Sequence, residues 1–413
     1  MTLSVTTLLM AHDGDTKRER LHSVRKSINA IAQEKQKSVS VVESLKHMFD
    51  DAKVSGNIRL IYADYNEKEP TTADNYATAV GGVVKYELAA FHGLNAEVSL
   101  FSANDINALS GTNAHHNAEL SSSKGSYTTV GEAYINYKYD AMNLRAGRQI
   151  LDTPLINNDD IRMVQDSYEA YTLGYSYKGA ALLAGHVNNW QGFDADLDVG
   201  WQKTGSKGVD FAGVSYHDIW EYNLWAYKFS DALDALYVDG GIEYPFNESM
   251  TLHAMVQYLH EKELDNSGYA TDIYGGMLEY VVNGLSFNLA YNQGRNTPGT
   301  MSFSGLGGGN LFTSMDTLIL DDIANDRNTQ FIVGGVVYEF ANFSLLYAYG
   351  NATGDTNAIG QKADIVEQDV SLEYNVNDKF LLNCVYAMQQ DRANSQKTEH
   401  DWNHLRVMLN YNF

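Results

Sequence analysis

From residue 54 to the C-terminus, apolar and polar side chains alternate along the chain with a period of two. Successive side chains of a β-strand point to opposite faces of a sheet, so this period predicts strands with one apolar and one polar face. The last segment is a clear case, because one of its faces carries Leu405, Val407, Leu409, Tyr411 and Phe413 while the other is mostly polar. The pattern predicts an all-β chain over residues 54–413.

The spacing of these segments predicts an antiparallel up-and-down barrel. Eighteen segments can be recognised, and the connections between them alternate between short turns such as 140–141 and long loops such as 296–327. An even number of strands with this rhythm is typical of barrels that have both chain ends on the periplasmic side. We therefore expect about eighteen strands, with sixteen as the alternative. All four prolines, at 70, 154, 245 and 298, are predicted to lie in connections, where no ladder hydrogen bond is lost.

A membrane location follows from the barrel rather than from helices. The chain is 20% charged and offers no apolar run of about 18 residues that could span a bilayer as a helix. Unpaired backbone groups are costly in hydrocarbon, so strands can cross a bilayer only when they close into a ring. With ~16 to 18 strands the ring encloses a water-filled lumen. The sequence predicts a multi-pass barrel in the outer membrane of a Gram-negative bacterium.

The N-terminal part differs from the barrel. Residues 1–11 are interpreted as the remnant of a secretory signal, because a short apolar run ends at a small residue, although a basic start is missing. In residues 12–53 apolar side chains recur mostly at helical spacing among charged ones, which predicts one or two amphipathic helical segments. These could form a periplasmic coiled coil, plug the lumen or stay partly disordered.

Charge narrows the range of partners. The chain has 29 Lys and Arg against 52 Asp and Glu, a net charge of −23, which argues against nucleic acid and favours the passage of cations. If the apolar face of each strand meets lipid, a mixed set of charged side chains lines the pore: Arg59, Glu97, Glu132, Lys138, Arg145, Glu243, His253, Glu279, Glu373 and Arg406. These groups either set a transverse field that selects solutes or merely solvate the wall.

The third long connection, residues 151–166, is the strongest candidate site. With its flanks it contains Gly147-Arg148-Gln149, Thr153-Pro154, Asp160-Ile161-Arg162 and Tyr168-Glu169. In these motifs and in its eighteen strands the chain resembles the OprD family of outer-membrane porins. The resemblance implies that this loop folds inward, constricts the channel and admits small molecules such as amino acids and carboxylates.

The resemblance also implies roles for single residues. Arg148 and Arg162 become candidates for a basic track, and Asp152, Asp159 and Asp160 for an opposing acidic side. Strict alternation puts Arg145 and Arg148 on opposite faces, so only one of them can point inward unless the strand is already leaving the wall. The alternative is that the carboxylates and arginines of the loop pair with each other and fix its conformation, which would itself hold a constriction in place.

Other signals are given a structural interpretation. The histidine pairs His115-His116 and His400 with His404 are expected in loops and on the inner wall rather than around a metal. Residues 305–309 are glycine-rich without a phosphate-loop lysine and are expected to form a flexible outer loop. Outer-loop carboxylates could bind a divalent cation or simply be solvated, namely Asp316, Asp321, Asp322 and Asp326. No cofactor is predicted.

Taken together, the sequence predicts a porin that allows passive diffusion of small polar solutes and ions. The alternatives are a surface adhesin or structural barrel, and a barrel enzyme, although no Ser, His and acid set supports the latter. Expected partners are outer-membrane lipid, including lipopolysaccharide, and the barrel assembly machinery, which would read the terminal aromatics Tyr411 and Phe413. A homotrimer is left open, and the sequence does not identify the solute.

Overall fold

The structure is a computed structural model that describes residues 44–68, 74–112, 115–122, 125–296, 298–308, 311–394 and 396–413. Within them, no helix is long and apolar enough to cross a membrane. The predicted signal remnant at 1–11 and most of the N-terminal segment at 12–53 lie outside the described residues. One short helix, α2 (Leu45–Asp50), precedes the first strand; Ser44 caps it and Met48 packs against Ala89.

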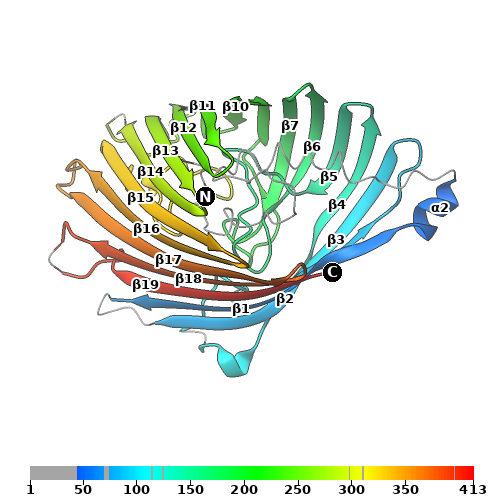
Figure 1. The fold of residues 1–413 in the computed structure, drawn as a ribbon, viewed down its shortest axis with the longest axis horizontal. Helices are drawn as coiled ribbons and strands as arrows, with labels where there is room; N and C mark the ends of the chain where they lie inside the picture. Colours follow the sequence, from blue (N-terminus) through cyan, green and yellow to red (C-terminus); the bar gives the residue numbers. More distant parts are fainter. Residues whose placement is uncertain are drawn as a thin grey trace.

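All wall strands are antiparallel and form one sheet that closes on itself (Figure 1). Nineteen strands are assigned, and one of them, β8 (Gln202–Lys203), is a two-residue addition in an outer loop that pairs with β7. The other eighteen form the wall: β1 (Lys53–Glu67), β2 (Asn75–Glu87), β3 (Leu94–Asp105), β4 (Tyr127–Tyr139), β5 (Met142–Gln149), β6 (Ser167–Tyr177), β7 (Ala180–Gln191), β9 (Val209–His217), β10 (Trp220–Phe229), β11 (Leu233–Asn247), β12 (Met250–Glu263), β13 (Thr271–Val282), β14 (Leu285–Asn296), β15 (Thr329–Phe340), β16 (Phe343–Gly354), β17 (Ala363–Asn377), β18 (Phe380–Asp391) and β19 (Trp402–Asn412).

The first and last strands close the ring. β1 pairs with β2 on one side and with β19 on the other, with Asn57 opposite Asn412 and Glu67 opposite Trp402. At the very end, Gly56 and Phe413 exchange two backbone hydrogen bonds of 3.1 Å each. The predicted barrel is therefore confirmed, with eighteen wall strands rather than sixteen.

One proline departs from the prediction. Pro245 lies inside β11, not in a connection. The strand register shifts between Pro245 and Asn247, so the ladder is already irregular where the proline nitrogen cannot donate. The prediction for this position was wrong because a bulge near a strand end tolerates proline as well as a turn does.

Aromatic side chains mark the periplasmic edge of the outer surface. They form close ring pairs on neighbouring positions, namely Tyr216–Tyr222, Tyr244–Phe246, Tyr338–Phe340, Phe343–Tyr374 and Phe380–Tyr411. Such girdles lie at the level of the lipid headgroups, where an amphipathic ring meets both hydrocarbon and water. This edge fixes the position of the wall relative to the bilayer.

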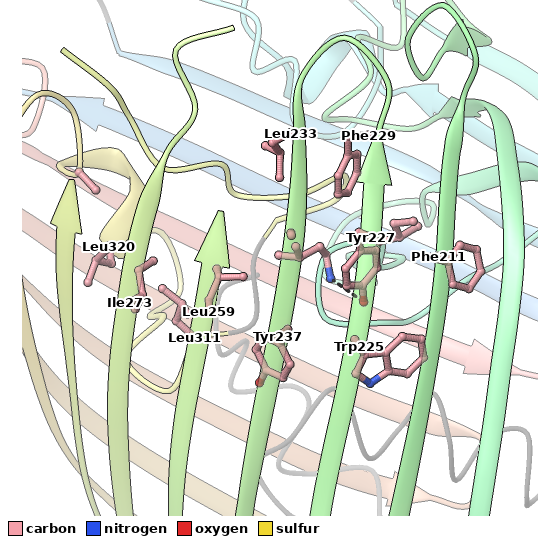
Figure 2. Packing of buried hydrophobic residues seen from close by; sticks show 14 of the residues in the cluster. Phe211, Trp225, Tyr227, Phe229, Leu233, Tyr237, Leu259, Ile273, Leu311 and Leu320 are labelled. Atoms are coloured by element: carbon pink, nitrogen blue, oxygen red, sulfur yellow. Dashed lines mark hydrogen bonds between the residues drawn. The ribbon is translucent and has the colours of Figure 1, made fainter. Parts of the chain in front are cut away.

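The inner face is not uniformly polar, which the alternation alone did not predict. On β9 to β11 the inward positions carry aromatic side chains, including Phe211, Trp225, Tyr227 and Tyr237, all at most 4% exposed. They belong to one buried cluster with loop residues such as Leu155, Ile156 and Leu311. Figure 2 shows two of the loop residues, Leu311 and Leu320, beside Leu259 and Ile273 of the wall. One side of the lumen is thus filled with packed apolar side chains, and the open passage is displaced toward the opposite side.

Candidate functional site: the constriction of the lumen

Several connections fold into the barrel, and residues 151–166 are central among them. The backbone of Ile156 forms a parallel bridge with Leu306, in which Leu306 N donates to Leu155 O at 2.9 Å and Asn157 N to Leu306 O at 3.0 Å. The loop after β14 is therefore folded inward together with the loop after β5. The loop after β3, whose Leu120 is fully buried, and the loop after β7, with Phe193 and Asp194, also contribute.

The glycine-rich stretch does not form the flexible outer loop that was expected. Gly305 has φ +84° and packs against the 151–166 loop so closely that a Cβ would lie 2.7 Å from Leu155 O. Gly307 has φ +80°, and a Cβ there would lie 2.2 Å from Asn157 O. The glycines are needed because the backbone is left-handed and two loops approach each other without room for a side chain.

Apolar side chains anchor these loops to the wall. Leu155 and Ile156 belong to the same buried cluster as Trp225, Tyr227 and Leu311. Leu155 N also donates a hydrogen bond to the hydroxyl of Tyr227, at 3.4 Å, from the strand beneath it (Figure 2). Burial of this apolar area, at about 25 cal/mol per Å², holds the loops against the wall.

Arg59 of β1 connects the wall to the tip of the 151–166 loop. Its guanidinium lies 2.7 Å from Asp160 Oδ1 and donates hydrogen bonds to Arg162 O, at 2.7 Å, and Asn410 Oδ1, at 3.1 Å. With 5% of its surface exposed, Arg59 is buried and its charge is balanced locally. This contact fixes the loop tip opposite the apolar anchor.

Arg162 lies at the surface of the remaining opening. It forms an ion pair with Asp159, and its guanidinium is stacked 3.9 Å above the centre of the Phe193 ring. Its Nε is also 3.8 Å from Glu119 Oε1, which belongs to the loop after β3. The side chain therefore joins two inward-folded loops and still faces the passage.

Arg406 of β19 contacts both the loop after β3 and the loop after β14. Its Nη1 donates to Glu119 Oε1 at 3.1 Å and its Nη2 to Asp316 Oδ1 at 2.7 Å. His404 lies two residues before Arg406 on the same face of β19. Its ring is 2.9 Å from Glu119 Oε2 and 3.7 Å from Asp316 Oδ2. Glu119 and Asp316 come from different loops, so these two wall residues pin both loops to the same strand.

The two loop carboxylates are held ionised by this arrangement. Burial alone would raise the pKa of Glu119, but His404 and Arg406 outweigh it and leave that pKa below its ordinary value. Burial opposes ionisation of Asp316 in the same way, and Arg406 and His404 again bring its pKa below the ordinary value. Next to them, Asp369 Oδ2 accepts from Asp316 N at 3.1 Å and Glu367 Oε1 accepts from Thr317 N at 2.9 Å.

These groups surround a cavity of about 540 Å³ in the lumen. Its wall carries five carboxylates, from Glu67, Glu119, Asp159, Asp194 and Asp316. Against them stand two guanidinium groups, from Arg162 and Arg406, and the imidazoles of His116 and His404. The cavity has the size for a small solute and an excess of negative over permanent positive charge.

Comparisons with known proteins agree with this geometry. Residues 46–413 match the family described as outer membrane porin, OprD family. The chain belongs to the OprD family. No curated protein matches it. Among solved structures, Pseudomonas aeruginosa OccK9 (OpdG) shares 14% identity, with 89% of this chain and 99% of that chain covered and a TM-score of 0.74. For Acinetobacter baumannii OccAB4 the identity is 16%, the coverage 88% and 98%, and the TM-score 0.74.

A third similar structure is Pseudomonas aeruginosa OpdK with vanillate, at 18% identity, 89% and 99% coverage and a TM-score of 0.72. Membership in the OprD family makes the protein a multi-pass outer-membrane porin of a Gram-negative bacterium. It is a channel for small solutes and not an enzyme, and its family implies no cofactor.

In this OprD-family porin, the residues predicted for the constriction separate into two groups. Asp159, Asp160 and Arg162 meet at the cluster described above. Arg148 does not join them, because its guanidinium lies 4.4 Å from the ring centre of Trp201 in the next outer loop. Asp152, at the start of the 151–166 loop, is half-buried and does not line the cavity. The sequence already pointed to this difference, because strict alternation places Arg145 and Arg148 on opposite faces of the strand and only one of them can point inward.

Of the predicted pore-lining residues, Arg59 and Arg406 belong to the constriction, and the others lie on the inner wall away from it. Glu97 and Glu132 face Lys85 at 2.9 Å and 3.2 Å. Arg145 stacks 4.2 Å above Tyr134, and Lys138 follows on the same face of β4. His253 lies between Glu221 and Glu279, with Glu243 opposite it in the strand register, and Glu373 is buried on β17.

Sequence reasoning missed the roles of Glu119, Asp316 and His404. His404 was placed on the inward face, but Glu119 and Asp316 lie in long loops for which the alternation has no meaning. Among the described residues, no group of three or more His, Cys, Asp or Glu side chains is placed to hold a metal ion. Asp316 pairs with Arg406, and Asp326 accepts backbone hydrogen bonds from Gly299 and Ala358. The divalent cation that the sequence left possible at the outer loops has no support in the part of the chain that the structure describes.

Proposed function

We propose that this porin passes small polar solutes and ions by passive diffusion and that its constriction favours solutes that carry a positive charge. The observation behind the proposal is the excess of carboxylates over guanidinium groups around the cavity. In a narrow passage with low-dielectric walls, such an excess concentrates cations and repels anions. Amino acids fit this description, because their ammonium group can meet the carboxylates while Arg162 and Arg406 meet their carboxylate group.

Planar-bilayer conductance tests the channel and its preference together. A salt gradient across the membrane should give stepwise, ohmic currents and a reversal potential of the sign expected for cations. In Asp159→Asn one carboxylate of the cavity is neutralised, so we expect a several-fold lower ratio of K⁺ to Cl⁻ permeability. Asp265→Asn is the matched control, because Asp265 is exposed in an outer turn and should leave the ratio unchanged.

Two results would contradict the proposal. A silent wild-type bilayer would favour a structural barrel or adhesin, and an anion-selective current would reject the charge argument while leaving the channel intact. Liposome swelling then ranks solutes, and the panel should contain basic amino acids, neutral amino acids, small carboxylates and sugars. An aromatic carboxylate belongs in it, because the similar OpdK was solved with vanillate.

Assembly and oligomeric state are separate proposals. We propose that the aromatic C-terminus, Tyr411 and Phe413, is the segment recognised by the barrel assembly machinery. Both side chains lie at the closing edge of the ring, with ring centres 6.3 Å apart. A homotrimer is proposed as the assembled form in the membrane, and the mass of the detergent-solubilised protein tests it.

A further inference from the structure

A row of charged side chains lies on the outward face of the wall, near the extracellular ends of β7 to β14. Directly opposed residues on neighbouring strands alternate in type: His186 faces Asp210, Asp210 faces Lys228, Lys228 faces Asp234, and Asp234 faces Lys262. On the next strands His260 faces Asp272, which faces Arg295. We call these eight residues the outer ladder.

The outer ladder lies at the level of the outer-leaflet headgroups. On β11, Asp234 and the girdle residue Tyr244 both face outward and are separated by ten positions. At about 3.3 Å per residue and a strand tilt of about 40°, this separation is about 25 Å along the membrane normal, the height of the apolar band of such barrels. The ladder therefore begins where hydrocarbon ends on the extracellular side.

Two of the three carboxylates of the outer ladder have hydrogen-bond or ion-pair partners within the protein, whereas its two lysines and its arginine form no ion pair with the described residues. Asp210 lies 2.7 Å from His186, and Asp272 accepts from Tyr258 at 2.7 Å and lies 2.9 Å from His260. Within the part of the chain that the structure describes, no ion pair joins Lys228, Lys262 or Arg295. Arg295 lies 5.7 Å from the centre of the Tyr274 ring and opposite Asp272, and Asp234 lies between the two lysines, yet none of the three cations is held in an ion pair by a described side chain.

An apolar furrow lies below the ladder on β10 to β15; its upper end is four residues below the ladder on β13 and β14, and its lower end reaches Trp220 at the start of β10. It has a volume of about 900 Å³, and small residues form its floor where long side chains would be expected on a lipid-facing wall. At Gly276 a Cβ would meet nothing closer than 3.6 Å, so the space above it is open. The sides are outward-facing apolar residues, among them Tyr222, Leu278, Leu289 and Ile332.

We propose that this face binds a phosphorylated lipid of the outer leaflet, with its phosphates on Lys228, Lys262 and Arg295 and one acyl chain in the furrow. Ammonium and guanidinium groups are the natural donors for phosphate oxygens, and a charge-assisted hydrogen bond is stronger than a neutral one. An acyl chain fills a hydrocarbon-lined groove that straight lipid packing would leave partly empty. The furrow follows the three cations along the membrane normal, so an acyl chain whose headgroup they hold enters the furrow at its upper end.

Native mass spectrometry of the whole barrel in detergent, titrated with bisphosphorylated lipid A, tests the proposal. The triple variant Lys228→Gln, Lys262→Gln, Arg295→Gln should bind this lipid at least about tenfold more weakly than the wild type. Arg392→Gln is the matched control, because Arg392 is also exposed near the outer rim but pairs with Asp364 on another side of the barrel. Monophosphorylated lipid A should bind the wild type more weakly and the triple variant with little further loss.

The furrow is tested separately. Gly276→Leu fills it and should weaken binding of both lipids, whereas Ala146→Leu, at an exposed outward position of β5 on another side of the barrel, should not. Heat-modifiable electrophoretic mobility and unchanged conductance verify that each variant is folded, since none of these residues faces the lumen. Equal lipid binding by the wild type and the triple variant would overturn the proposal. It would also fail if the triple variant altered only the oligomeric mass, because the face would then contact a second copy of the chain.

Discussion

At the scale of single residues, Arg406 connects the wall to two loops that fold into the lumen. It is 1% exposed and pairs with carboxylates from two separate loops, Glu119 of the loop after β3 and Asp316 of the loop after β14. Removing one member of a buried ion pair leaves the partner's charge uncompensated, at a cost of about 3–5 kcal/mol. Arg406, which the sequence predicts as a pore-lining charge, thus holds in place two loops that fold into the lumen.

Arg406→Gln should therefore change both selectivity and loop order. Glu119 and Asp316 lose their common guanidinium partner, so we expect a higher ratio of K⁺ to Cl⁻ permeability and noisier open-channel current in planar bilayers. Arg145→Gln removes the same charge from the inner wall, where Arg145 stacks on Tyr134 away from the constriction, and should change the current far less. Equal effects of the two substitutions would show that only total lumen charge matters.

The same loops should respond to acid. The pKa of Glu119 in the folded protein lies below its ordinary value of about 4.3. Its ion pairs therefore stabilise the folded loop fully at pH values above the ordinary pKa, and this stabilisation is lost as the pH falls through the lowered pKa of the folded protein. Asp316 shifts in the same direction, and Arg162, His404 and Arg406 face the pair from the other side. Open-channel noise should therefore be constant near neutral pH and rise below about pH 4.

Glu119→Gln isolates this effect. The amide cannot ionise, so the loop should already be looser at neutral pH and show a smaller additional change in acid. If the variant and the wild type follow the same pH profile, the transition belongs to other carboxylates.

At the scale of elements, the inward fold of two loops depends on glycine. Gly305→Ala places a Cβ 2.7 Å from Leu155 O at a left-handed backbone position, which an L-residue adopts at a cost of about 1–2 kcal/mol even without a clash. The loop after β14 should move away from the 151–166 loop, and single-channel conductance should rise. Gly299→Ala serves as control, because Gly299 has φ +81° but no atom within 4 Å of the Cβ position. Its conductance should stay close to that of the wild type.

The strands could be predicted from the sequence and the loops could not. Strand limits such as 220–229 follow from alternation, because a wall strand has one lipid face and one inner face along its whole length. That rule fails for Trp225 and Tyr227, which face inward yet are apolar, since the loops that cover them are distant in sequence. Likewise the partners Glu119, Asp316 and Arg406 come from three separate parts of the chain, and no local period relates them.

At the scale of the whole molecule, the barrel is closed by its last residue. Phe413 exchanges both of its backbone hydrogen bonds with Gly56, and these bonds do not depend on the phenyl ring. The ring itself is 39% exposed on the periplasmic edge and packs beside Tyr411. Because the bonds that close the seam are backbone bonds, the role proposed for the ring in assembly can be tested apart from the stability of the closed barrel.

Phe413→Ala should accordingly lower the amount of assembled barrel in the outer membrane several-fold, because the assembly machinery would read the terminal ring before the seam forms. Heat-modifiable mobility of isolated membranes measures this yield, and thermal unfolding of the purified barrel should be nearly unchanged, since the bonds with Gly56 remain. Phe340→Ala is the control, because Phe340 is a 64% exposed aromatic residue at the same periplasmic edge but does not lie at the C-terminus. Loss of thermal stability without loss of membrane yield would assign Phe413 to the wall instead, because a recognition signal acts on the rate of closure and not on the closed state.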